Sequence, residues 1–204
     1  MPARNIVKQY DVDSYYHVYN RGVNKRKIFV DDEDYVVFLG LLKRYLGSGN
    51  EKDKYNRDYQ SFYEELDLLA YCLMPNHFHL LLFQHEDVKS MELLMRRVIT
   101  TYTMYFNKKY KRVGHLFQGA YKASRIANEP YLLHISRYIH MNPKDYKNWP
   151  YSSWPYYTKG WSADWVKQAK IFELFEGGNY ERFVEDYEQS KDEWEMLKLE
   201  LANG

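Results

Sequence analysis

Two apolar runs separated by only two turn residues constrain the fold of this chain more than any other feature. The runs read LDLLAYCLM over residues 66–74 and HFHLLLF over residues 77–83, with Pro75 and Asn76 between them. Apolar runs of this length bounded by turn residues are typical of buried strands, and the short break predicts a β-hairpin. The sequence therefore places a β-hairpin near the middle of the chain.

Further elements flank this hairpin in a regular order. Alternating aromatic and β-branched residues predict a strand over residues 15–23, and a second strand is predicted over residues 116–126. Apolar residues at helical spacing predict helices over residues 31–49, 90–110 and 128–141, the second with Ser90 as its N-cap. The order β-α-β-β-α-β-α predicts an α+β fold of ferredoxin-like type. Its antiparallel sheet would carry helices on one face and leave the other face open for a substrate.

The last part of the chain differs in composition from the rest. Residues 171–204 contain ten acidic and three basic residues, so this segment carries a net charge of −7 in a chain whose net charge is +1. Residues 149–161 are rich in proline and aromatic residues and predict a loop, with two short acidic helices after it. We therefore expect one domain over residues 1–157 and an acidic, helical extension over residues 158–204.

Several features bear on where such a chain works. No apolar run approaches the ~20 residues that a bilayer-spanning helix needs, and the N-terminal residues lack the apolar core of a signal peptide. Cys72 is the only cysteine, which excludes an intrachain disulfide. We expect a soluble, cytoplasmic protein without a membrane partner.

Basic residues gather in two segments. Residues 96–125 contain eight basic residues and no acidic one, and four more basic residues precede the acidic run over residues 31–34. Such clusters can hold phosphates or can simply form a solvated face, and the 22 tyrosines can stack on bases or pack in a core. The candidate nucleic-acid contacts are Arg21, Lys25, Arg26, Lys27, Arg96, Arg97, Lys108, Lys109, Lys111, Arg112, Lys122 and Arg125; Gln118 is either a base or backbone contact or an ordinary loop amide.

Two histidines interrupt the second apolar run of the hairpin. His77 and His79 are two residues apart, so they point to the same face of a strand. Two neutral imidazoles at this spacing can chelate one divalent metal ion. A metal ion needs more ligands than these two, so a purely structural role for the histidines is the alternative.

The helix predicted over residues 128–141 offers those further groups. His134, Tyr138 and Asn142 are four residues apart and share one helix face. Asn142 has a hard oxygen ligand, and Tyr138 is a possible nucleophile or one more packed ring. Two imidazoles and one amide oxygen would leave positions open for water or a phosphate oxygen, as a catalytic metal requires. His134 is a candidate base or a packing residue, and His140, turned away from Tyr138, is assigned to packing.

These motifs resemble those of a known protein family. MPNHFHLLL, followed some sixty residues later by YIHMNP, resembles the single-tyrosine HUH transposases, and more narrowly the REP-associated tyrosine transposases of the IS200-like group. The stretches YHVYNRGVNKRKIF, GHLFQGAYKA and WPYSSW resemble further elements of that family in the same order. The resemblance extends over residues 15–154.

The resemblance implies a role for each motif residue. It makes His77 and His79 metal ligands, Tyr138 the nucleophile, and Asn142 the third ligand, where relatives more often carry glutamine. It implies Mg²⁺ or Mn²⁺ as cofactor and single-stranded hairpin DNA as partner. It also implies cleavage through a 5′-phosphotyrosine that leaves a free 3′-hydroxyl. Relatives act as monomers or as dimers, so a homodimer is open.

Two other functions remain compatible with the sequence. The chain could bind hairpin DNA or RNA without catalysis, or it could be a metal hydrolase that uses water in place of Tyr138. The intact set of His77, His79, Tyr138 and Asn142 favours the transposase over the silent binding module.

Overall fold

The computed structural model describes residues 10–49, 51–175 and 178–188 of the 204-residue chain. Its strands are β1 (Ser14–Arg21), β2 (Leu66–Met74), β3 (His77–Gln84) and β4 (Lys122–Ile126). Its helices are η1 (Val23–Lys25), α1 (Asp32–Leu46), α2 (Ser90–Lys109), α3 (Glu129–His140), α4 (Trp154–Thr158), α5 (Ala169–Phe172) and α6 (Tyr180–Glu188). None of the helices within these residues is long and apolar enough to cross a membrane.

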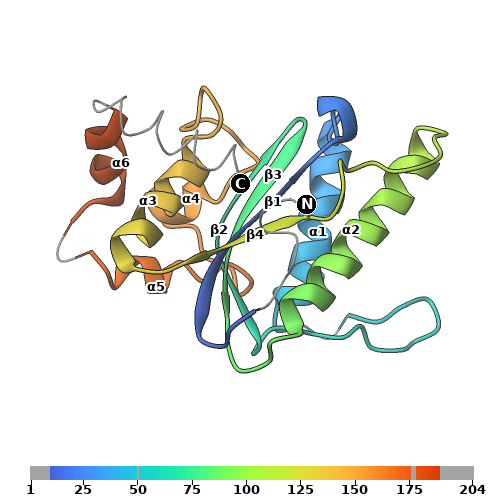
Figure 1. Ribbon diagram of the computed structural model, residues 1–204, viewed down its shortest axis with the longest axis horizontal. Coiled ribbons are helices and arrows are strands. Elements are labelled where there is room, and N and C mark those ends of the chain that lie inside the picture. Colours follow the sequence, from blue (N-terminus) through green and yellow to red (C-terminus); the bar gives the residue numbers. More distant parts are fainter. Residues whose placement is uncertain (1–9, 50, 176–177, 189–204) are drawn as a thin grey trace, which may run out of the picture.

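The four strands form one antiparallel sheet in the order β2-β3-β1-β4 (Figure 1). Together with the element order β-α-β-β-α-β, this arrangement confirms the predicted α+β fold of ferredoxin-like type. In the register of the central strands, Arg21 lies opposite His77 and Tyr19 lies opposite His79. On the other side of β1, Tyr19 lies opposite Lys122 of β4. The two histidines are therefore at one end of the sheet, beside the start of β4.

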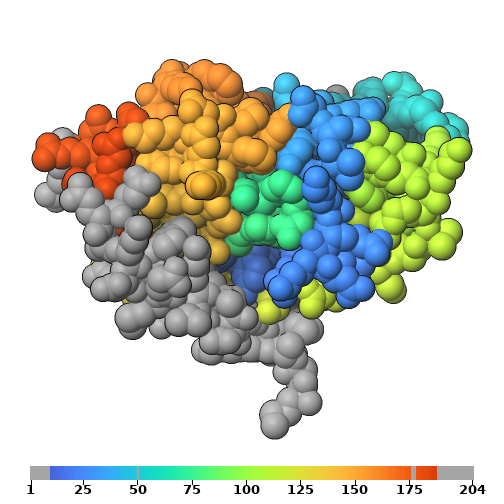
Figure 2. Space-filling view, turned by 90° about the horizontal axis from the view of Figure 1, so that it is seen from above, coloured from blue at the N-terminus to red at the C-terminus, as the bar shows by residue number. Residues whose placement is uncertain are grey.

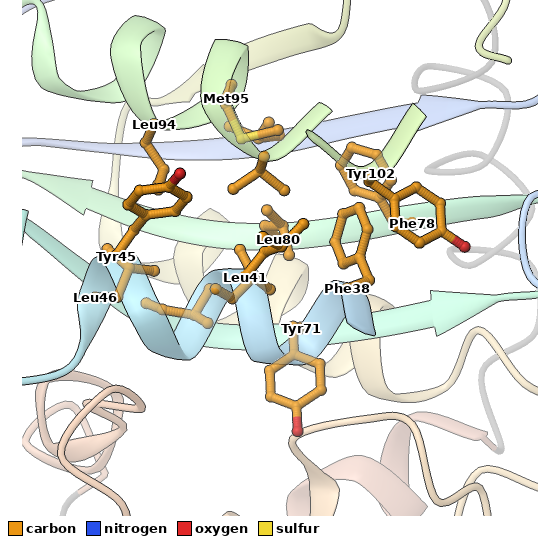
Figure 3. Close-up of a cluster of buried hydrophobic side chains, with 14 of the residues drawn as sticks. Phe38, Leu41, Tyr45, Leu46, Tyr71, Phe78, Leu80, Leu94, Met95 and Tyr102 are labelled. Atoms are coloured by element: carbon orange, nitrogen blue, oxygen red, sulfur yellow. The ribbon is translucent and has the colours of Figure 1, made fainter. Parts of the chain in front are cut away.

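Helices α1 and α2 cover one face of the sheet. Phe78 and Leu80 of β3 pack there against Phe38 and Leu41 of α1 and Leu94 of α2, in a buried cluster shown in Figure 3. Because side chains alternate along a strand, His77 and His79 lie on the opposite face. Large apolar side chains in this cluster are fully buried, so this layer supplies much of the hydrophobic stabilisation of the domain.

The other face of the sheet is covered as well, which corrects the expectation that helices lie on one face only. Leu81 and Phe83 of β3 pack against Leu132 and Ile135 of α3, and Figure 1 shows α3 to α6 on the side of the sheet opposite α1 and α2. The physical reason lies in β3 itself, because both of its faces carry apolar residues that must be removed from water. The end of this face that carries His77 and His79 is polar.

Capping residues set the starts of two helices. Asp31 accepts a hydrogen bond from the backbone N–H of Asp34, and the two residues form a capping box at α1. Asn128 accepts from the N–H of Tyr131 at 2.9 Å and caps α3. Ser90, expected as the N-cap of α2, is instead its first helical residue, and its hydroxyl donates to Asp87 and Glu65.

One end of the molecule brings together three segments that are far apart in the sequence. The N–H of Gly22 donates to Asn76 O at 2.8 Å, and the N–H of Val23 donates to Leu116 O at 3.0 Å. We call this end, formed by residues 21–28, 75–77 and 108–118, the hairpin edge; Figure 2 looks onto it. A Cβ at Gly22 would lie 2.2 Å from Arg26 O, so only glycine fits this junction.

The hairpin edge also explains why the strand predicted over residues 116–126 is shorter than expected. The N–H of Gln118 donates to Arg21 O at 2.9 Å, and Phe117 forms an isolated bridge with Gly22. Residues 116–121 therefore bond to the end of β1 and the loop after it, and regular pairing with β1 begins only at Lys122.

The described part of the C-terminal segment packs closely on α3. Tyr180, Val184 and Tyr187 of α6 are buried, and the Tyr180 hydroxyl lies 2.8 Å from His140 Nδ1. The segment over residues 149–161, expected as a loop, contains the one-turn helix α4, since Trp154 is buried and anchors it. Of the two expected acidic helices, α6 is acidic and α5 is not. Residues 189–204 of the predicted extension lie outside the described residues, and its boundary at residue 157 stays a prediction.

Burial of His140 leads to a pH prediction. Its Nδ1 contacts Tyr180 and its Nε2 lies 2.7 Å from Ser153 Oγ, which confirms the packing role expected for it. Burial lowers the pKa of His140 from 6.5 to about 3. The unfolded chain therefore binds a proton below pH 6.5 that the folded chain does not, so stability present above pH 6.5 is lost as the pH falls.

Lowering the pH from 7 to 5 is expected to reduce the free energy of unfolding by about 2 kcal/mol through His140 alone. Denaturant unfolding at both pH values should give a smaller loss for His140→Asn than for the wild-type chain. His115→Asn, at an exposed histidine, should keep the wild-type loss. Equal losses in all three proteins would contradict the prediction.

Candidate metal and nucleophile site

The two strand histidines lie at the start of β3, on the face covered by α3. Their ring centroids are 5.0 Å apart, and His79 is 5% exposed. His77 Nδ1 lies 2.6 Å from Asn76 Oδ1, and its Nε2 lies 3.0 Å from Asn142 Oδ1. The structure therefore brings both histidines and Asn142, predicted from distant motifs, to one place.

Helix α3 supplies the phenol and the amide of the site. The Tyr138 ring lies 5.4 Å from the His79 ring, centroid to centroid, in an edge-on arrangement. Tyr138 is 8% exposed and hydrogen-bonds with the Asn142 side chain, which follows one turn later, just beyond the end of α3. Pro143, which follows Asn142, disfavours further helix and keeps that residue at the edge of the site.

The protonation states of these groups follow from burial. Burial lowers the pKa of His77. Burial, together with the neighbouring imidazoles of His17 and His77, lowers the pKa of His79 well below its usual value. Both imidazoles are therefore neutral at pH 7, the form that binds metal ions. Burial raises the pKa of Tyr138, and its hydrogen bond with Asn142 opposes this shift. Its phenol is thus protonated at neutral pH.

The contacts of His77 test whether these residues fit a cation. The Asn76 amide nitrogen donates to Lys25 O at 3.3 Å, so Asn76 Oδ1 is the atom that faces His77 Nδ1 and accepts its proton. His77 Nε2 then carries a lone pair toward Asn142 Oδ1, 3.0 Å away. Two ligands at right angles around Mg²⁺, each at ~2.1 Å, lie about 3 Å apart. The spacing of His77 Nε2 and Asn142 Oδ1 therefore fits two ligands of one divalent cation.

The donor set also limits which cation suits it. Among residues 10–49, 51–175 and 178–188, no cluster of three His, Cys, Asp or Glu side chains could hold a metal ion. The set of two imidazoles and one amide oxygen is instead mixed and incomplete. It leaves positions for water or phosphate oxygens, which suits Mg²⁺ or Mn²⁺ better than a closed zinc site.

His17 is a residue of this site that the sequence did not predict. It lies on β1, is 1% exposed, and places its Nε2 2.8 Å from His79 Nδ1. Its ring also lies 5.8 Å from the Tyr138 ring. The alternation of side chains along the strand places His17 on the same sheet face as Tyr15 and Tyr19. Only the pairing of β1 with β3, however, brings it to His79.

Part of the predicted basic set lies on the hairpin edge, close to this site. Arg21 Nε donates to Gln118 Oε1 at 2.8 Å on the exposed surface, directly opposite His77 in the strand register. The Lys122 ammonium lies 5.8 Å from the centre of the Tyr19 ring, which neighbours His79. The remaining members at this edge are Lys25, Arg26 and Lys27 in the loop after β1, and Lys108, Lys111 and Arg112 around the end of α2.

Four of the predicted basic contacts lie elsewhere or have other partners. Arg96 and Arg97 lie in the first half of α2, over the sheet face opposite the histidines, and Arg97 donates to Gln60 Oε1. Lys109 forms ion pairs with three acids at the start of α1. Arg125 pairs with Asp11 at 3.1 Å. The structure does not bring these four cations to the site.

The candidate base on α3 points toward the C-terminal helix. His134 Nδ1 lies 2.8 Å from the Arg137 guanidinium, and its ring lies 5.3 Å from the Tyr187 ring of α6. These contacts favour the packing role that the sequence left open for His134.

Comparisons with known proteins agree with this arrangement. Residues 51–142 match the family described as Transposase IS200 like. The range includes both strand histidines, Tyr138 and Asn142. Comparison with curated protein sequences gives no match.

One solved structure shows a similar fold. The structure of a REP-associated tyrosine transposase bound to a REP hairpin matches with a TM-score of 0.55 and 15% identity, over 78% of this chain and 89% of that chain. A transposase structure from Deinococcus radiodurans R1 is similar with a TM-score of 0.36 and 20% identity, over 65% of this chain and 92% of that chain. Residues 51–142, which carry both strand histidines, Tyr138 and Asn142, therefore match the IS200-like transposase family, and the chain shares the fold of a REP-associated tyrosine transposase.

Proposed function

We propose that this chain cleaves and rejoins single-stranded DNA, with Tyr138 as the nucleophile and a divalent cation held by His77, His79 and Asn142. The match of residues 51–142 to the IS200-like transposase family supports DNA cleavage and rejoining. The single observation that carries the detailed proposal is the approach of Tyr138 and Asn142 of α3 to the two histidines of β3. All four residues come from one chain, so the proposed site is complete without a second copy.

The chemistry starts from the charge of the phosphodiester. When bound, Mg²⁺ or Mn²⁺ offsets the negative charge of the phosphate and stabilises the charge that develops during displacement. The Tyr138 oxygen attacks phosphorus, the bond to the 3′-oxygen breaks, and the chain becomes joined to the 5′ end of the DNA. The product is a phosphodiester like the substrate, so a 3′-hydroxyl can attack it in turn and rejoin a strand.

The residues around Tyr138 determine the protonation state and the position of its phenol before it attacks. Burial keeps the phenol protonated, since it raises the pKa of Tyr138. Asn142 hydrogen-bonds to this side chain and also faces His77, so it ties the nucleophile to the ligand set. The phenolic proton must leave as the P–O bond forms, and the departing 3′-oxygen gains a proton, so the step balances overall.

The proposed substrate is a single strand that carries a hairpin. A flexible strand can bend into the site, with bases stacking on aromatic rings and phosphates meeting cations. Arg21 donates to Gln118 and lies opposite His77 in the strand register, so this pair supports a DNA contact beside the proposed site. The similar REP-associated transposase was solved with a REP hairpin, which supports a hairpin ligand here.

A covalent-adduct assay tests the proposal. The chain is incubated with end-labelled single-stranded hairpin DNA and Mn²⁺, and the products are separated under denaturing conditions. A DNA-linked protein band and a free 3′-hydroxyl strand are the expected result. Cleavage without any linked protein would instead indicate a hydrolase, and binding without cleavage would indicate a silent binding module.

The assignment of DNA contacts to the hairpin edge makes a separate prediction. Arg26→Ala should weaken hairpin binding several-fold and reduce the slope of log affinity against log salt by about 0.7 to 1, as expected for one lost phosphate contact. Arg96→Ala, the same change on the first half of α2, should have a smaller effect on both. Fluorescence anisotropy at several salt concentrations measures this. An Arg96→Ala effect as large as that of Arg26→Ala would contradict the assignment.

A further inference from the structure

His17 and His79 are two buried, uncharged rings that contact each other. His17 Nε2 and His79 Nδ1 are 2.8 Å apart, and the rings lie nearly parallel with centroids 5.0 Å apart. His17 Nδ1 is buried and has no hydrogen-bond partner among the described residues. The hydrogen bond to His79 is therefore the only one that the His17 side chain makes there.

A single hydrogen bond between two neutral imidazoles has two possible proton arrangements. If His17 donates from Nε2, His79 carries its own proton on Nε2 and has no lone pair for a metal ion on that atom. If His79 donates from Nδ1, its Nε2 is free to bind a cation, and the His17 proton lies on Nδ1. Only the second arrangement makes His79 a ligand through Nε2.

Packing prevents His17 from leaving this contact. Its ring stacks on Tyr19 at a centroid distance of 4.9 Å, and the edge of the Tyr138 ring lies on another side at 5.8 Å. The His17 ring is 1% exposed, so water cannot replace His79 as its hydrogen-bond partner. The side chain is thus held against Nδ1 of His79.

We propose that His17 is a positioning residue that holds His79 in the ring orientation and tautomer that present Nε2 to the divalent cation. The proposal rests on the metal site of the proposed function and adds a residue to it. A partner that accepts the second N–H of a metal-bound histidine fixes its tautomer and raises its basicity, and losing such a partner commonly lowers metal affinity 10–100-fold.

Mn²⁺ binding to the DNA-free chain, measured by electron paramagnetic resonance, tests this. His17→Phe keeps a flat ring but has no acceptor, and its Mn²⁺ affinity should fall about 10–100-fold. His17→Gln, whose carbonyl oxygen can accept the His79 Nδ1–H, should stay within a few-fold of the wild-type chain. Wild-type affinity in a folded His17→Phe chain would overturn the inference. A wild-type chain that binds no Mn²⁺ would instead overturn the proposed metal site itself.

A second measurement needs no substitution. Long-range ¹⁵N–¹H spectra of the histidine rings report which nitrogen of His79 carries the proton, and Mg²⁺ leaves these signals observable. At saturating Mg²⁺, His79 should carry its proton on Nδ1 and show a shifted Nε2. A proton that stays on Nε2 of His79 under those conditions would overturn the inference.

Discussion

Replacing Tyr138 by phenylalanine is expected to abolish the covalent protein–DNA adduct and to slow strand cleavage by at least about 10³-fold. Phenylalanine keeps the ring that packs against His79 and His17 and removes only the hydroxyl oxygen that would attack phosphorus. The Tyr138 side chain is 8% exposed, and the conservative change keeps its buried ring. The packing of the fold should therefore be retained. The measurement is the adduct assay with hairpin DNA and Mn²⁺.

The matched control for this change is Tyr55→Phe, which removes a hydroxyl from a tyrosine that is 66% exposed. It should leave adduct formation at the wild-type level. Full cleavage by Tyr138→Phe would show that water or another side chain attacks the phosphate, and the transposase mechanism proposed for this site would then be wrong.

The second large effect is expected at the metal ligands. His79→Ala should weaken Mn²⁺ binding by more than about 100-fold, because it removes a ligand outright, whereas loss of an outer-shell partner already costs 10–100-fold. Cleavage should fall with it at fixed Mn²⁺ concentration. His79 packs against the rings of His17, Tyr19 and Tyr138.

His85→Gln is the matched control, because this histidine follows the opposite end of β3 and pairs with Asp67 at 2.9 Å. Its Mn²⁺ affinity should equal that of the wild-type chain. If His79→Ala bound Mn²⁺ as tightly as His85→Gln, the cation would have to lie somewhere other than the site formed by β3 and α3.

Patterns with a short range in sequence predicted most of the site. His77 and His79 share a face because strand side chains alternate, and Tyr138 and Asn142 meet because they are one helical turn apart. The hairpin turn at Pro75 and Asn76 was equally local. The prediction that these two pairs approach each other came from the family resemblance, and the geometry of β3 and α3 agrees with it.

What the sequence could not provide depended on register and packing between distant segments. His17 reaches His79 only through the pairing of β1 with β3, which no local pattern specifies. Lys109 looked like one of a run of free cations, yet the capping acids of α1, some 75 residues earlier, surround it. The cover on the second sheet face likewise required knowing that α3 packs back on β2 and β3.

The central claim is that Tyr138 becomes covalently joined to the 5′ end of a cleaved strand. After reaction with hairpin DNA and Mn²⁺, nuclease and trypsin digestion followed by mass spectrometry locates the linked nucleotide. Trypsin cleaves after Arg137 and Lys144, so the peptide over residues 138–144 contains one tyrosine only. A 5′-nucleotide on Tyr138 in this peptide is the predicted result, and a nucleotide linked to any other residue would contradict the account.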